Sequence, residues 1–234
     1  MSCFDRFYEL WLHQLKVHLH QLVSAPKPSA PTPTENEKLN NQTTQLINRV
    51  ITHYDDYCRV KTHAAKHDPF SVLSASWTTS LERSLQWVSG WRPTTLFHLV
   101  YTESSVRFEA QLIDLLRGER TGDLGDLSPS QLSQISDLQC QTVREENEVS
   151  TELSHWQESA GDLVSLFSDG DDEPNIERLV MVLEKAENLR LRTIKTVVEI
   201  LTPQQAVDFL IAAAELQFGI RGWGLDTDHR RQRK

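Results

Sequence analysis

The chain has 234 residues, a net charge of −9 and 38% hydrophobic residues. This length allows one large or two small domains, and six tryptophans and eight phenylalanines supply apolar surface for a core. The acidic balance argues against general attraction to nucleic acid, and no run of 18 apolar residues predicts a membrane span. Three widely spaced cysteines favour reduced thiols in an intracellular protein.

The N-terminal region shows a helical repeat of large apolar side chains. A first helix is expected from about Phe4 to Val23, because apolar residues recur there at three- and four-residue steps. Residues 24–34 are rich in Pro, Ser and Thr, which predicts an extended, mobile linker. A second helix is expected from about Glu37 to Lys66.

Prolines mark the starts of later helices and interrupt no periodic stretch. No alternating pattern of strand type persists. The sequence therefore predicts an all-α bundle of about seven helices in one domain, residues 1–225, followed by a basic tail, residues 226–234. The five later helices are expected at about 72–88, 93–117, 129–167, 174–200 and 203–220.

Three segments carry specific signals for helix ends. Ser128-Pro129 and Thr202-Pro203 each have Gln three residues after the hydroxyl residue, which predicts an N-cap with a reciprocal capping side chain. The third segment runs from Trp77 to Pro93 and holds three of the six tryptophans. We expect its helix to end at Gly90, with Trp91 buried at the corner before the next helix.

With these three segments in order, the chain resembles the plant Delay-of-Germination (DOG) domain family from Phe4 to Gly224. That domain occurs alone in seed and stress regulators and as the C-terminal part of TGA-type bZIP transcription factors. The resemblance implies a stand-alone, non-enzymatic regulator linked to seed dormancy, abscisic acid response and transcription. It also implies protein partners among signalling or transcription factors, and a nuclear and/or cytoplasmic location.

Direct DNA recognition is not expected from the residues, although the resemblance carries that label. No basic helix precedes a leucine-zipper seam in this chain, and the first helix carries only Arg6 and Lys16 as basic residues apart from histidine. The basic end from His229 to Lys234 fits a weak nuclear-import signal or a solubilising end.

Enzyme and metal signals are weak. The sequence has no Gly-rich phosphate loop, nucleophile elbow or His-Glu-x-x-His helix. His63 and His67 are four residues apart and would share a helix face, but His53 and Cys58 lie off that stripe. We therefore expect no catalytic residue, no metal site and no cofactor.

A small-molecule sensor is the alternative function. Trp77, Trp87 and Trp91 would line a pocket for an apolar or planar ligand, although aromatic residues at helical spacing are more often part of a core. Glu82 and Arg83 interrupt this apolar region, and we expect them to pair with Arg92 or Glu109.

Partner binding has two candidate surfaces. Phe7, Tyr8 and Trp11 on the first helix either bind a partner or close the protein's own core, and the core is favoured. Residues 145–177 contain eleven acidic residues and no Lys or Arg, which is typical of a solvated face and also suits docking of a basic partner. A homodimer is left open.

Overall fold

The computed structural model describes residues 3–25, 33–117, 121–163 and 173–233. Most of the predicted linker (26–32) and the segment 164–172 lie outside these ranges. Within them the chain is helical and forms no strand beyond one isolated bridge between Trp87 and Gly90. This confirms the all-α fold.

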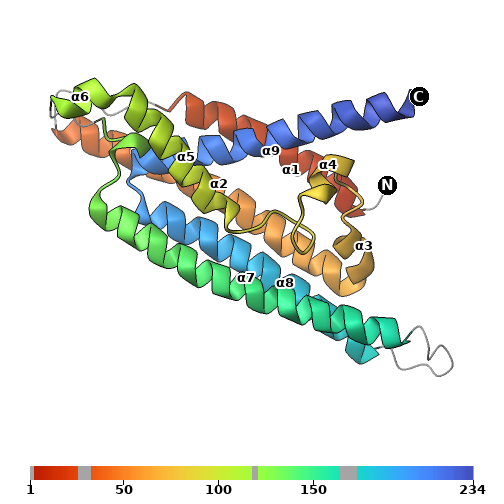
Figure 1. Ribbon diagram of the computed structural model, residues 1–234. Coiled ribbons are helices and arrows are strands. Elements are labelled where there is room, and N and C mark those ends of the chain that lie inside the picture. Colours follow the sequence, from red (N-terminus) through yellow and green to blue (C-terminus); the bar gives the residue numbers. More distant parts are fainter. Residues whose placement is uncertain (1–2, 26–32, 118–120, 164–172, 234) are drawn as a thin grey trace.

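In the part of the chain that the structure describes, six long helices build the bundle and short ones lie at its corners (Figure 1). The long helices are α1 (Cys3–Val23), α2 (Pro33–His67), α5 (Thr95–Ala110), α7 (Pro129–Leu163), α8 (Glu173–Ile200) and α9 (Pro203–Gln232). The short ones are α3 (Pro69–Ser74), α4 (Ser80–Ser84), α6 (Leu112–Leu116) and the 3-10 turn η1 (Leu124–Asp126).

The core surrounds α2, which contacts α1, α8 and α9. In Figure 1, α7 and α8 pair along one side and α1 and α9 along the other, while α2 contacts α1, α8 and α9 between them. The first half of α9 is almost entirely enclosed, and Val207, Phe209 and Leu210 are at most 2% exposed. α9 also contacts α1, α2, α4 and α5, so its first half lies at the centre of the bundle.

Both predicted capping boxes are present. Thr202 and Gln205 exchange backbone and side-chain hydrogen bonds at the start of α9, and Ser128 and Gln131 do the same at the start of α7. The two boxes are also joined, because Gln131 Nε2 donates to Gln205 Oε1 at 2.7 Å. Gln205 Nε2 in turn donates to the carbonyl of Asp126 at 3.2 Å.

The predicted helix over 72–88 is wrong. Asp68 caps α3, and Ala75 ends it with a positive φ of 46°. Thr79 and Glu82 then form a capping box that begins α4. After α4 the chain turns sharply between Trp87 and Gly90, where Val88 and Ser89 take positive φ angles of 46° and 58°. L residues rarely adopt this conformation, so a helix cannot pass through it.

Arg190 of α8 holds this turn in place. Its Nε donates to the Trp91 carbonyl at 2.7 Å, and its Nη2 donates to the carbonyls of Trp87 and of Val88, the latter at 2.8 Å. Arg190 also pairs with Glu187, which binds Lys61 Nζ at 2.7 Å. A Cβ atom at Gly90 would lie 2.8 Å from the guanidinium carbon, so any larger residue there would displace the Arg190 side chain from the turn.

Two other helix ends differ from expectation. The predicted helix over 93–117 breaks at Gln111, whose side chain donates to Asp123 Oδ2 at 2.9 Å, and α6 follows the break. The last helix continues to Gln232 instead of ending near Ile220, so most of the predicted basic tail is helical. Close packing supports this extension, because a Cβ at Gly224 would lie 2.0 Å from Thr79 Oγ1 and Asp228 accepts from the Ser80 N–H at 3.0 Å.

The joined capping boxes predict energetic coupling between α7 and α9. Gln131→Ala and Gln205→Ala should each lower the free energy of unfolding. The loss in the double variant should be smaller than the sum of the two single losses by about 1 kcal/mol. The reason is that the Gln131–Gln205 hydrogen bond is lost in either single variant. Urea unfolding of the four proteins measures this coupling, and additive losses would contradict it.

The Arg190 network predicts a large difference between two arginines of α8. Arg190→Met should lower the free energy of unfolding by about 3–5 kcal/mol. The substitution leaves Lys61 as the cation beside Glu187, and it removes the arginine donor from the carbonyls of Trp87, Val88 and Trp91. Arg192→Met is the matched control, since Arg192 is 55% exposed and pairs at the surface with Glu145, and its loss should cost below about 1 kcal/mol. Equal losses in denaturant unfolding would rule out the proposed role of Arg190.

Candidate functional site

A cavity of about 300 Å³ lies beside the turn from Trp87 to Gly90 that Arg190 holds in place, which we call the clamped turn. Tyr8 of α1 and Tyr54 and Tyr57 of α2 form one part of its wall, and Trp91 and Leu96 another. α8 adds Ile194, and α9 closes the remaining side with Ala213, Leu216, Gln217 and Ile220. The wall is therefore aromatic and aliphatic, with a few polar groups, which is the usual composition of a small-molecule pocket.

The three tryptophans of the predicted pocket have different environments. Trp91 is half-buried and lines the cavity, so it is not the fully buried corner that we expected. Trp77 is buried, and its ring lies 4.4 Å from that of Phe4. Trp87 donates from Nε1 to Ser150 Oγ at 2.8 Å. Trp77 and Trp87 are absent from the wall, and the tyrosines of α1 and α2 occupy the aromatic positions instead.

The aromatic face of α1 points into the bundle. Tyr8 and Trp11 are buried, and Phe7 is half-buried against the core with its ring 5.6 Å from that of Phe4. Trp11 Nε1 donates to the His53 carbonyl at 3.0 Å, and His53 Nε2 lies 3.0 Å from the Trp11 carbonyl. These contacts attach α1 to α2. A partner-binding role for Phe7, Tyr8 and Trp11 stays a prediction.

One end of the cavity is polar because Glu82 is buried there. Its carboxylate accepts from the Tyr8 hydroxyl at 3.0 Å, from Gln217 Nε2 at 3.3 Å and from Arg221 Nη1 at 3.3 Å. Burial and the neighbouring Glu82 carboxylate raise the pKa of Tyr8 far above its ordinary value, so the phenol stays neutral and donates. The expected pairing of Glu82 with Arg92 is wrong.

Arg92 instead joins the cavity to α7. Its Nε donates to Glu146 Oε2 at 2.7 Å, and Glu146 Oε1 accepts from the Thr94 N–H at 2.7 Å, next to the start of α5. Glu146 is fully buried, so this member of the acidic run 145–177 is not part of a solvated face. Glu145 and Glu152 pair with Arg192 and Lys185 of α8. Use of the run as a docking surface stays a prediction, and residues 164–172 lie outside the described ranges.

The clamped turn contributes one polar group that has no protein partner. Ser89 is 5% exposed and belongs to the cavity wall, while its carbonyl accepts from Lys61 Nζ at 2.6 Å. Its hydroxyl has no hydrogen-bond partner in the described part of the chain. Buried hydroxyl groups are normally paired, so this one is exceptional.

Histidine and cysteine positions offer no metal centre in the described ranges. His63 Nε2 and His67 Nε2 lie 3.3 Å apart on exposed surface near the end of α2, but no group of three or more His, Cys, Asp or Glu side chains there is arranged to hold an ion. Burial lowers the pKa of His53 to about 4. Burial likewise raises the pKa of the Cys58 thiol, so Cys58 stays protonated.

No helix among the described residues is both long and apolar enough to cross a bilayer.

Comparison with known proteins gives one consistent set of relatives. A family model described as seed dormancy control matches residues 18–102. Protein DOG1-like 4 of Arabidopsis thaliana is 30% identical over 236 residues, covering 94% of this chain and 91% of that protein. Protein DOG1-like 1 of the same plant is 28% identical, with 83% and 82% covered.

A second group of relatives consists of transcription factors. The TGACG-sequence-specific DNA-binding protein TGA-2.1 of Nicotiana tabacum is 27% identical over 91% of this chain but over only 44% of its own length. The similarity therefore concerns one part of that larger protein. Because the similarity to DOG1-like 4 extends over nearly the whole of both proteins, the chain belongs to the DOG1 family.

Proposed function

We propose that this chain is a non-enzymatic plant regulator that acts by binding other proteins. The description of the matching family is seed dormancy control, and the relatives of this chain include DOG1-like proteins and transcription factors. We extend the resemblance to a role in seed dormancy and abscisic acid response, with signalling or transcription factors as partners and a nuclear and/or cytoplasmic location.

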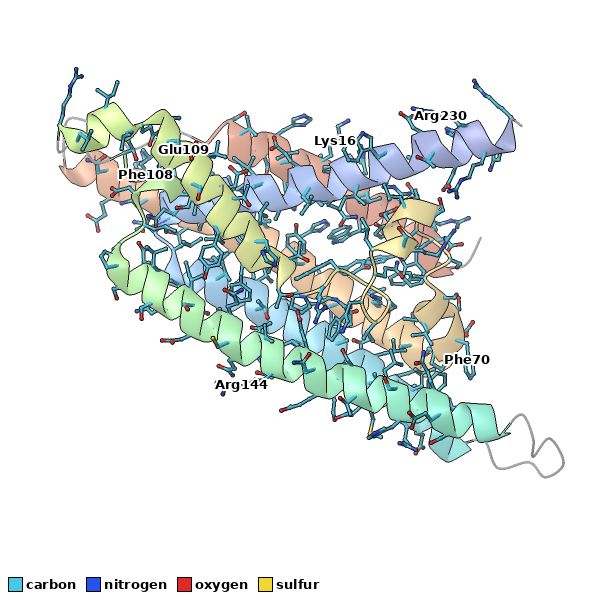
Figure 2. All side chains as sticks on the ribbon, in the orientation of Figure 1. Lys16, Phe70, Phe108, Glu109, Arg144 and Arg230 are labelled. Carbon is cyan, nitrogen blue, oxygen red and sulfur yellow. The ribbon has the colours of Figure 1, made fainter. Side chains whose placement is uncertain are left out.

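An exposed apolar patch on α5 and α6 is the observation that best supports protein binding. Its members are between 41% and 79% exposed and lie within eleven residues of sequence: Val106, Phe108, Leu112, Ile113 and Leu116. Figure 2 shows Phe108 at the end of the bundle formed by α5 and α6, far from Arg230 on α9. Exposed apolar side chains that gather in one region of the surface are often protein-interaction sites.

The patch suits an amphipathic helix of a partner protein. Such a helix binds by inserting apolar side chains at three- and four-residue spacing into a hydrophobic surface. Ile113 and Leu116 are the most exposed members and are three residues apart on α6. They are therefore the first positions to test. Direct sequence-specific DNA binding is not part of this proposal, because the chain carries a net charge of −9.

Ile113→Asp should remove most partner binding without unfolding the protein. The reason is that it places a charge in the patch while changing a side chain that is 66% exposed, where substitutions alter stability by about 0.5 kcal/mol or less. Tagged protein expressed in developing seed, followed by affinity purification and quantitative mass spectrometry, measures the bound partners.

Leu10→Asp is the matched control, because Leu10 on α1 is 65% exposed and lies outside the patch. It should retain the partners of the unmodified protein. If Ile113→Asp also retains them, the patch is not the binding surface. If the unmodified protein retains no regulator at all, the proposed function itself fails.

A further inference from the structure

We propose that the cavity beside the clamped turn is a binding site for a small, planar and mostly apolar molecule carrying one hydrogen-bond acceptor. This goes beyond the proposed function, since the patch for protein binding lies elsewhere on α5 and α6. The site uses residues of α1, α2, α4, α5, α8 and α9 and of the turn after α4, so it exists only in the folded bundle.

The size and wall of the cavity select the shape of the ligand. A volume of about 300 Å³ is at the lower end of the range for small-molecule pockets, so a ligand of few rings fits it. Tyr8, Tyr54, Tyr57 and Trp91 present aromatic surface from two helices and the turn. Aromatic side chains stack favourably on flat rings, whereas a saturated chain gains only burial of apolar area.

The polar groups of the wall select one functional group on the ligand. Glu82, Tyr8 and Gln217 already satisfy one another at one end of the cavity. Ser89 differs, because its buried hydroxyl has no hydrogen-bond partner among the described residues. A carbonyl or ether oxygen on the ligand would accept a hydrogen bond from such a hydroxyl group.

The rigidity of the wall supports a preformed site. Ser89 sits in a positive-φ turn whose carbonyls are bound by Arg190 and Lys61. Backbone held in a rarely populated conformation is concentrated at ligand and active sites, where surrounding structure fixes it. The cost of ordering this part of the wall is therefore already met in the free protein, which favours binding.

Acetylnaphthalene, a flat bicyclic ketone, is the test ligand, and undecanone is its flexible counterpart of similar size. Calorimetry and ligand-observed NMR should detect one bound acetylnaphthalene per chain with a Kd below about 1 mM. Undecanone should bind at least about tenfold more weakly. The absence of acetylnaphthalene binding would overturn the site, and equal binding of undecanone would overturn the preference for planar molecules.

Two leucines of α9 provide a matched pair of variants. Leu216→Trp narrows the cavity and should weaken acetylnaphthalene binding by about tenfold or more, whereas Leu225→Trp, at a similarly exposed position outside the wall, should not. Ala213→Phe fills the cavity from another position of the same wall and should give the same loss. Thermal melts verify that each variant folds. Unchanged binding in a folded Leu216→Trp or Ala213→Phe protein would contradict the location.

Ser89→Ala tests the hydrogen bond separately. It should weaken binding of acetylnaphthalene by about fivefold but leave binding of naphthalene, which lacks the ketone, unchanged. Equal affinity of Ser89→Ala and the unmodified protein for acetylnaphthalene would show that this hydroxyl does not contact the ligand.

Discussion

The buried guanidinium of Arg190 is the constraint on which the middle of the molecule depends. Arg190, Lys61 and Glu187 are at most 2% exposed, and together they carry two positive charges and one negative charge. Burial of such charges costs several kcal/mol unless each finds partners. The excess positive charge is met by carbonyl oxygens of the turn after α4, which accept from both Arg190 and Lys61. The turn therefore supplies hydrogen-bond acceptors for the buried cations, and the cations stabilise the turn.

This mutual stabilisation explains why the chain leaves the helical path after α4. Positive φ angles at Val88 and Ser89 cost about 1–3 kcal/mol each. Hydrogen bonds to a charged donor contribute about 1.5–3 kcal/mol each, and Arg190 makes three to this segment. These hydrogen bonds offset the strain, which stabilises the tight turn. The cavity lies next to this turn, and Ser89, Gly90, Trp91 and Arg92 form part of its wall.

The sequence predicted the elements whose signals are local. The long helices follow from apolar periodicity, and the capping boxes at Thr202 and Ser128 follow from hydroxyl, proline and glutamine at fixed spacing. Asp68-Pro69 and Thr79 with Glu82 are signals of the same kind, and they would have separated α3 from α4. The turn at Val88 could not be predicted in this way. Its conformation depends on Arg190, 102 residues later in the chain.

Of the three tryptophans that we expected around a pocket, Trp91 lines the cavity and Trp77 and Trp87 do not, for a related reason. A stripe of apolar residues shows which face of a helix is buried, but it does not show whether that face meets protein or a cavity. Tyr54 and Tyr57 lie on the buried side of α2 and line the cavity, whereas Trp77 is equally buried and contacts Phe4. The two tryptophans at the turn differ in the same way, because Trp87 bonds to Ser150 of α7 while Trp91 lines the cavity. Long-range contacts, not local pattern, thus separate a core aromatic residue from one that lines the candidate site.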